Sequence, residues 1–387
     1  MAGIYIHIPF CRQACHYCNF HFSTSLKLQN GFLDALLKEI ALRSNYIGDE
    51  QVETIYFGGG TPSLLPKLHL ELIMNAIRRT FSVSSNAEVT FEANPDDIHK
   101  VTLQDWKQAG INRLSIGVQS FFEEDLLWMN RAHTATEAAI CIRLAQDAGF
   151  DNMSIDLIYG TPGLTDVKWE QNMQTAADLG IPHLSCYALT VEPGTPLDAM
   201  TRKKKVQAVS NEDQARQFLL MSDFFQSKGY AHYEISNLCL PGKKSVHNSS
   251  YWNGAKYLGL GPSAHSFNGY SRQWNISNNA VYIQLLNSPG TAAFRGLPEN
   301  IPVLAEIETL SETQQFNEYI MTALRKMEGV DIDFTKNQFS AKYAEELLAG
   351  SRKYVQQRWI ENIPGKLILT REGKLFADQI ASELFSI

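Results

Sequence analysis

Three cysteines, Cys11, Cys15 and Cys18, stand within eight residues of one another, directly after an apolar stretch that ends at Phe10. With the spacing C-x3-C-x2-C, one loop can ligate three irons of a cubic 4Fe-4S cluster. The fourth iron is then open to an external ligand. A small molecule that carries an amine and a carboxylate can chelate an open iron, so the loop predicts a cluster with a cofactor or substrate bound to it.

Other uses of these thiols are less consistent with the sequence. Structural zinc needs four ligands, or three and a water, and C-x3-C-x2-C is not a usual finger spacing. The chain has only six cysteines in 387 residues, which is too few for a disulfide framework. The other three, Cys141, Cys186 and Cys239, are scattered singly, and we interpret them as small buried hydrophobes or inert thiols.

The composition is typical of a globular protein with a sizeable core, because 44% of the residues are hydrophobic and 19% are charged. The net charge of −7 argues against a general nucleic-acid binder. No apolar run reaches the roughly 18 residues of a membrane span, and the ten residues before Cys11 are too short for a secretory signal, so we expect a cytoplasmic location. The basic run Arg202–Lys205 is interpreted as a solvated loop, with docking of an acidic partner or of lipid headgroups as the alternative.

The first half of the chain repeats one unit, a short β-branched strand followed by a turn and an amphipathic helix. The expected strands are Gly3–Ile8, Glu53–Phe57, Ala87–Glu92, Arg113–Gln119, Met153–Ile158 and His183–Leu189. The expected helices include Gly31–Arg43, Leu68–Thr80, Thr102–Ala109, Ala135–Ala148 and Trp169–Leu179, with helix-ending glycines at Gly110, Gly149 and Gly180. Six such units imply a parallel sheet with right-handed crossovers, either doubly wound or closed into a barrel.

A barrel is favoured because each strand ends in a residue that can do chemistry. These residues are Cys11, the run Gly58–Thr61, Glu92, Gln119 and Asp156. The carboxyl ends of barrel strands converge on one mouth, so the residues would surround a single site. The glycine run lets the backbone come within contact distance of a ligand, and it is not a phosphate loop because no Lys-Ser or Lys-Thr follows it.

Five segments, in the order expected of one family, carry a resemblance that runs nearly the whole length of the chain. They are Tyr5–Cys11, Gly58–Pro62, Phe91–Pro95, Ser115–Phe121 and Asp156–Gly160. With them the chain resembles the oxygen-independent coproporphyrinogen III oxidase-like family of radical-SAM proteins, and within it the haem-chaperone branch. The resemblance implies an α/β fold with a partial (β/α)6 barrel. It also implies a 4Fe-4S cluster that gives one electron to S-adenosylmethionine, which breaks into methionine and a 5′-deoxyadenosyl radical.

The family's S-adenosylmethionine contacts carry over only where the motifs match. The implied contacts are Tyr5, Tyr17, Gly59, Gly60, Thr61, Glu92, Gln119, Arg131 and Asp156. Arg131 matches through the spacing of Asn130-Arg131-Ala132-His133 more than through its neighbours.

Two features separate the chain from the oxidase itself. The cysteine motif of the oxidase is C-x3-C-x2-C-x-C, with a fourth cysteine two residues after the third. In this chain Phe20 stands at that position. The oxidase also carries a long N-terminal extension, whereas ten residues precede Cys11 here. We therefore expect no coproporphyrinogen oxidase activity.

A motif of the chaperone branch, H-N-x-x-Y-W, is matched by the segment His247-Asn248-Ser249-Ser250-Tyr251-Trp252. Haem binding in that branch is attributed to this motif. A neutral imidazole is a common axial ligand of haem iron, and Tyr251 and Trp252 offer flat apolar faces to the macrocycle. We expect His247 to be an axial ligand or to lie close to one. The alternative is a hydrogen-bonded histidine beside two core aromatics. His265 is a second candidate ligand, and the histidines near the cysteines are interpreted as structural.

The resemblance favours a haem chaperone that binds haem and transfers it to acceptor proteins, using the cluster and S-adenosylmethionine. The alternatives are the oxidase and a radical-SAM enzyme on another substrate, so whether the chain is an enzyme stays open. The implied partners are haem, haem-accepting apoproteins with membrane respiratory enzymes as a candidate class, and an electron donor for the cluster, without nucleic acid.

Three domains are expected. Residues 1–233 form the radical-SAM core, 234–305 a connecting segment with the haem motif, and 306–387 a helical, winged-helix-like domain. The strand and turn at Leu367–Gly373 would be the wing. Without a basic recognition helix, we interpret the last domain as one that docks a partner or covers the active site.

Overall fold

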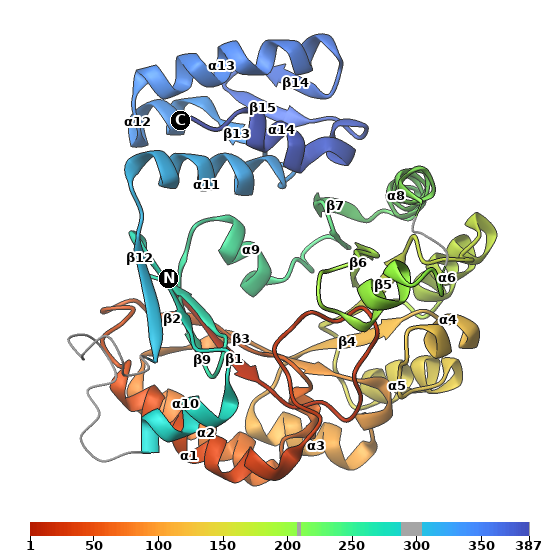
Figure 1. Cartoon of the computed structure of the whole chain (residues 1–387), viewed down its shortest axis with the longest axis vertical. Coiled ribbons are helices and arrows are strands. Elements are labelled where there is room, and N and C mark those ends of the chain that lie inside the picture. Colours follow the sequence, from red (N-terminus) through yellow and green to blue (C-terminus); the bar gives the residue numbers. More distant parts are fainter. Residues whose placement is uncertain (207–209, 288–303, 387) are drawn as a thin grey trace.

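The computed structural model describes residues 1–206, 210–287 and 304–386 (Figure 1). Residues 207–209 and residues 288–303, the latter within the expected connecting segment, lie outside the described residues. So does Ile387. The chain forms a large α/β body and a smaller C-terminal module, which lies at the top of Figure 1.

Six parallel strands in chain order form the centre of the α/β body, as the sequence predicts. They are β1 (Ala2–Ile8), β2 (Val52–Gly59), β3 (Val83–Ala93), β4 (Arg113–Gln119), β5 (Met153–Tyr159) and β6 (His183–Ala188). The helices between them cover the outer face of the sheet (Figure 1). They are α1 (Gln29–Leu42), α2 (Lys67–Thr80), α3 (Lys100–Ala109), α4 (Glu123–Trp128), α5 (Ala135–Asp147) and α6 (Asp166–Asp178).

The alternation of side chains in each strand separates the core from the site. In β4, Leu114, Ile116 and Val118 are buried in the main hydrophobic core. Successive side chains of a strand point to opposite faces, so the alternate residues of β4 lie on the other, inner face. These are Arg113, Ser115, Gly117 and Gln119. The polar residues that the sequence places at strand ends therefore face the inside of the sheet.

The sheet continues beyond the six strands at both edges. Next to β1 lie β9 (Lys256–Leu260), which is parallel to it, and then β10 (His265–Phe267), β11 (Ser271–Asn275) and β12 (Ala305–Thr309). Next to β6 lie β8 (Asn237–Cys239) and β7 (Ala231–Glu234). Three more helices, α7 (Pro196–Arg202), α8 (Asn211–Ser227) and α10 (Asn279–Asn287), pack around this body. The segment 234–305 thus contributes strands to the same sheet as the core.

A short helix, α9 (Val246–Trp252), lies against the inner face of the sheet. The Glu88 carboxylate on β3 accepts the backbone N–H groups of Val246 at 3.1 Å and His247 at 2.9 Å. This carboxylate satisfies donors that the start of a helix leaves without intrahelical partners. Glu88 is four residues before Glu92 on the same face of β3, so α9 lies one layer below the strand ends.

The C-terminal module has its own core. It contains α11 (Glu312–Leu324), β13 (Val330–Asp331), α12 (Ile332–Gln338), α13 (Ala341–Gln356), β14 (Ile360–Ile363), β15 (Lys366–Leu369) and α14 (Ala377–Glu383). Buried Phe316, Leu347 and Leu367 pack together inside it. The first three of these helices and the three-stranded sheet β13-β15-β14 follow one another in the order of a winged helix, and α14 comes after them. Within the described residues, no helix has both the length and the apolarity needed to cross a membrane.

Arg325, which follows α11, attaches the module to the body. Its guanidinium donates to the buried Glu234 carboxylate at 3.0 Å and lies over the Trp252 ring at 5.1 Å. The module therefore contacts the body at the carboxyl end of α9.

Candidate cofactor site at the barrel mouth

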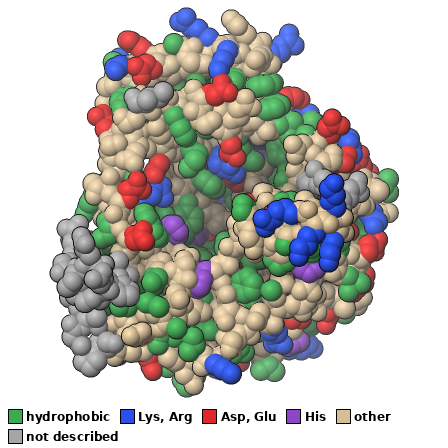
Figure 2. All heavy atoms as spheres, in the orientation of Figure 1, with side chains coloured by type: hydrophobic (Ala, Val, Ile, Leu, Met, Phe, Trp, Pro, Cys, Tyr) green, Lys and Arg blue, Asp and Glu red, His purple; other side chains and the backbone are tan. Residues whose placement is uncertain are grey.

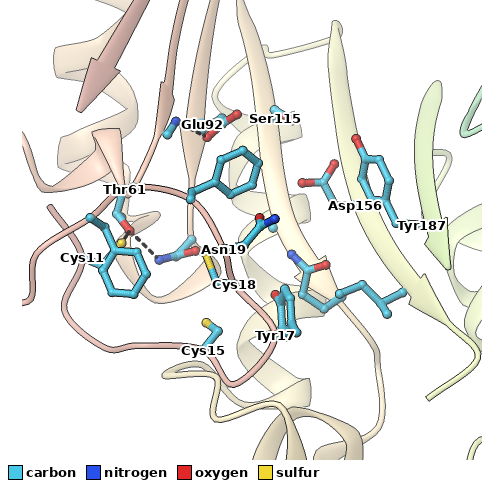
Figure 3. A pocket seen from close by; sticks show the side chains of 18 of the residues that line it. Cys11, Cys15, Tyr17, Cys18, Asn19, Thr61, Glu92, Ser115, Asp156 and Tyr187 are labelled. Atoms are coloured by element: carbon cyan, nitrogen blue, oxygen red, sulfur yellow. Dashed lines mark hydrogen bonds between the residues drawn. The ribbon is translucent and has the colours of Figure 1, made fainter. Parts of the chain in front are cut away.

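A cavity of about 430 Å³ opens at the carboxyl ends of the six parallel strands. Figure 3 shows the cysteines of the loop on one side of it and Asp156 and Tyr187, on neighbouring strands, on the other. The predicted residues that line it are Cys11, Cys15, Tyr17, Cys18, Gly59, Gly60, Thr61, Glu92, Gln119, Arg131 and Asp156. The strands and the loops thus bring together residues from six separate segments of the sequence.

Tyr5 and His247 do not line this cavity. The Tyr5 hydroxyl is 3.1 Å from His7 Nδ1, and its ring stacks on Tyr56 with centroids 6.1 Å apart. The sequence analysis missed other lining residues, among them Phe22, Tyr56, Asn94, Ser115, Ser185, Tyr187 and Asn248. Ser115 lies on the same face of β4 as Gln119, and Ser185 and Tyr187 alternate along β6, so period-two counting along the strands could have found these three.

The three thiols of the loop have polar contacts suited to metal ligands. Thr61 Oγ1 donates a hydrogen bond to Cys11 Sγ at 3.4 Å, and Arg131 Nη1 donates one to Cys15 Sγ at 3.4 Å. Burial raises the pKa of Cys11 to about 11, and burial also raises the pKa of Cys18. Positive metal ions replace the thiol protons on binding, so burial alone does not prevent ligation.

The arrangement of the thiols is compatible with the predicted cluster. All six cysteines of the chain are free thiols, and those of the loop face one cavity. Among the described residues, no group of three His, Cys, Asp or Glu side chains converges as a single-ion site requires. A cubic cluster takes its ligands at separate corners and does not need that convergence. The residues present therefore fit the group that the spacing predicts.

Glu92 and Asp156 are the carboxyl groups that the parallel strands bring to the cavity, which Glu192 also lines. Glu92 accepts hydrogen bonds from the Tyr56 hydroxyl at 2.7 Å and the Gly59 N–H at 3.2 Å. Burial, which outweighs these bonds, raises the pKa of Glu92 to about 7. Burial likewise raises the pKa of Asp156 to about 6, although a hydrogen bond from Ser185 opposes the shift. A cationic ligand in the cavity would favour the ionised form of both groups.

Arg131 joins the cysteine loop to the strand ends. Its Nη2 donates to Asn94 Oδ1 and to Gly117 O, both at 2.7 Å, while Nη1 contacts Cys15. Its buried Nε has no hydrogen-bond partner among the described residues. Gln119, at the end of β4, has a φ of 67°, a left-handed conformation that is unusual for a residue other than glycine. Strained backbone of this kind often occurs where a side chain is held in a binding site.

The glycine run is needed first for packing within the chain. A Cβ at Gly59, which has a φ of 102°, would lie 2.4 Å from the His7 ring, and one at Gly60 would lie 2.6 Å from Ile8 O. These glycines therefore let β2 approach the end of β1. The same approach presents their backbone to the cavity, as the sequence predicts.

His247 lies below the cavity and is only 1% exposed. Its Nδ1 is 2.7 Å from Thr54 Oγ1, its Nε2 is 2.8 Å from the Tyr251 hydroxyl, and its ring stacks on Tyr56 at 4.9 Å. Burial lowers the pKa of His247 to about 3, so the ring is neutral. Both nitrogens are engaged in this conformation, which is the hydrogen-bonded arrangement that the sequence analysis gave as its alternative. His265 is exposed and stacks on Trp274 at 6.2 Å.

Two family models match the chain. The Radical SAM superfamily matches residues 5–176, and the HemN C-terminal domain matches residues 310–376. The first match covers the cysteine loop and the parallel strands from β1 to β5, and ends near the end of α6, before β6. The second covers most of the C-terminal module.

Curated relatives match over nearly the whole length. "Heme chaperone HemW" of Bacillus subtilis is 33% identical over 98% of both chains. The protein of the same name from Mycobacterium tuberculosis is 33% identical over 99% of this chain and 94% of its own, and that of Escherichia coli is 35% identical over 68% and 69%. Among solved structures, coproporphyrinogen III oxidase (HemN) from Escherichia coli has a TM-score of 0.84 at 22% identity, covering 100% of this chain and 90% of its own. This likeness confirms the predicted fold.

Proposed function

This chain belongs to the HemW family, and from that premise we propose that it binds haem and transfers it to acceptor proteins, using a 4Fe-4S cluster and S-adenosylmethionine. The observation that carries the proposal is the cavity itself, in which three free thiols of one loop face two carboxyl groups at the strand ends. The acceptors are haem-binding apoproteins, with membrane respiratory enzymes as a candidate class. Because all six cysteines are free thiols, we place the chain in a reducing compartment, the cytoplasm.

Cys11, Cys15 and Cys18 would hold the cluster, and the Gly59–Thr61 backbone would border the bound S-adenosylmethionine. When bound, the cluster supplies one electron to the sulfonium of S-adenosylmethionine. The ionised Glu92 carboxylate would hold the positively charged cofactor. The Arg131 Nε, which has no partner among the described residues, offers a donor to the cofactor's carboxylate.

For haem we propose the H-N-x-x-Y-W segment, with His247 Nε2 as the iron ligand. Nε2 is bonded to the Tyr251 hydroxyl in this conformation, so that bond must open and α9 must move before iron can reach the ring. Nδ1 would stay bonded to Thr54, which would fix the tautomer as partners of ligating histidines commonly do. The neutral ring needs no deprotonation before it ligates.

Haem titration of four variants, followed by absorbance, tests this ligand. His247→Ala should shift or abolish the Soret band and weaken binding. Tyr251→Phe should strengthen binding, because it removes the group that competes with iron for Nε2. His265→Ala tests the exposed alternative, and His99→Ala, at the start of α3, is the matched control without effect. Native haem affinity in both His247→Ala and Tyr251→Phe would show that the histidine is structural.

Haem transfer tests the function as a whole. Haem-loaded protein is mixed with an apoprotein that binds haem b, and the acceptor's spectrum is followed for the wild type and for Cys15→Ser. We expect transfer by the wild type and impaired transfer by the variant. Anaerobic incubation with coproporphyrinogen, S-adenosylmethionine and dithionite tests the oxidase alternative, and formation of protoporphyrinogen would favour it.

A further inference from the structure

The basic run Arg202–Lys205 is held in place at the end of α7. The backbone N–H groups of Lys203, Lys204 and Lys205 donate to carbonyl oxygens of α7 at 2.9 to 3.2 Å. All four side chains are exposed. The Arg202 guanidinium pairs with Asp198 at 2.6 Å, whereas the three lysines form no ion pair with any described residue. One or two cations would satisfy the dipole at a helix end, so the run leaves a surplus of positive charge.

Helix α7 packs directly on the loop that carries the cysteines. The Leu197 N–H donates to His16 O at 2.8 Å, between Cys15 and Tyr17 in the sequence. Leu197 also belongs to a small apolar cluster on which Tyr17 packs from the cysteine loop and Val206 from the end of the basic run. The cysteine loop and the end of the basic run therefore pack against the same apolar cluster.

An exposed apolar side chain borders the same loop. His16 contacts the end of α4 through its Nδ1, 2.8 Å from Trp128 O, and through its N–H, which donates to Met129 O at 3.1 Å. Leu127, the residue before Trp128, is 68% exposed. Basic side chains gather to the right of centre in Figure 2. Docking surfaces of transient complexes commonly combine a small apolar contact with complementary charge around it.

We propose that Leu127 and the run Arg202–Lys205 form the docking surface for an acidic protein that carries one electron on a flavin or an iron–sulfur centre. The chain as a whole has a net charge of −7, so this positively charged surface differs in sign from the rest of the protein. Its charge would attract and orient an acidic partner. The patch adjoins the loop that would hold the cluster, which favours an electron carrier over a lipid surface. One electron passes from the reduced carrier to the oxidised cluster, the carrier is oxidised by one electron, and no covalent bond forms or breaks. The proposal rests on the proposed function of the cavity.

Charge reversal at the lysines tests the surface. The variant K203E/K204E/K205E is compared with K100E/K336E/K342E, which makes the same charge change at exposed lysines of α3, α12 and α13. The probe is a bacterial flavodoxin, a small acidic FMN protein. Its affinity is measured by calorimetry at low and high salt, and cluster reduction is followed by electron paramagnetic resonance. We expect at least tenfold weaker, less salt-dependent binding and slower reduction by flavodoxin in the first variant only.

Reduction by dithionite, a small inorganic reagent, should be the same in all three proteins. Wild-type flavodoxin affinity in K203E/K204E/K205E would overturn the proposal. A second result would also overturn it. If the wild type binds vesicles with 25% phosphatidylglycerol, and the variant loses this binding but keeps its flavodoxin affinity, the run serves lipid headgroups. Flavodoxin binding is also measured on the cluster-free protein, so a failure of the chain to hold a cluster is distinguished from a failure of docking.

Discussion

Affinity for S-adenosylmethionine should rise with pH, because Glu92 titrates in the range of the measurement. Burial raises the pKa of Glu92 to about 7 in the free protein. A carboxyl with that pKa is about one tenth ionised at pH 6 and about nine tenths ionised at pH 8. If the cationic cofactor requires the carboxylate, Glu92 accounts for an approximately tenfold loss of affinity between pH 8 and pH 6.

Glu92→Gln removes this titration and keeps an amide oxygen for the Tyr56 hydroxyl. It loses the acceptor for the Gly59 N–H, because an amide nitrogen would face that donor. At pH 8 we expect the variant to bind S-adenosylmethionine about 1–3 kcal/mol more weakly.

Protein stability should respond in the opposite sense to pH. The folded protein retains a proton on Glu92 that the unfolded chain has released, so this group's contribution to the unfolding free energy is present at low pH. It is lost as the pH rises from about 4.5 to about 7. The loss is at most about 3.5 kcal/mol, since the pKa is raised from 4.5 to about 7 and each pKa unit is worth about 1.4 kcal/mol. Glu92→Gln should abolish this part of the pH dependence of chemical unfolding.

Calorimetric titration of anaerobically reconstituted protein at pH 6, 7 and 8 measures the binding effect. The amine of S-adenosylmethionine also titrates in this range, so the quantity of interest is the difference between wild type and Glu92→Gln. Glu345→Gln, at an exposed position of α13, is the matched control and should follow the wild type. Parallel pH profiles for wild type and Glu92→Gln would refute the assigned role.

Three further outcomes are expected. Cys15→Ser should abolish the visible iron–sulfur absorbance while Cys141→Ser retains it, and a full cluster in Cys15→Ser would contradict the ligand assignment. Phe20→Cys should yield no protoporphyrinogen from coproporphyrinogen by chromatography, because a thiol at this exposed rim position adds no group that holds the substrate. Arg325→Ala should lower the unfolding free energy in urea by about 3 kcal/mol, since it leaves the buried Glu234 carboxylate unpaired, without changing the iron–sulfur absorbance.

Features that depend on residues close together in the sequence could be predicted. The bounds of β4, Arg113–Gln119, are those expected, because its apolar side must pack under helices and its ends are marked by turns. The C-x3-C-x2-C loop is equally local. The residues that line the cavity followed from the rule that parallel strand ends converge, combined with the family resemblance.

Contacts between residues far apart in the sequence could not be predicted. His247 and Thr54 are 193 residues apart, and no pattern near either residue indicates that they meet. The carboxylate of Glu88 and the first N–H groups of α9, which it accepts, are likewise far apart in the sequence. In this conformation the His247 imidazole is enclosed beneath Tyr56, because α9 lies inside the sheet.

The parallel pairing of β9 with β1 has a consequence for how the chain folds during synthesis. Ala2 is paired with Lys256, so the first strand obtains its second neighbour only after about two thirds of the chain has left the ribosome. Until then β1 is an edge strand, and pairing over such a sequence separation is slow to form. We expect the cysteine loop that follows β1 to be open to iron–sulfur delivery during this interval. A chain arrested before β9 would expose the same edge to pairing with other chains.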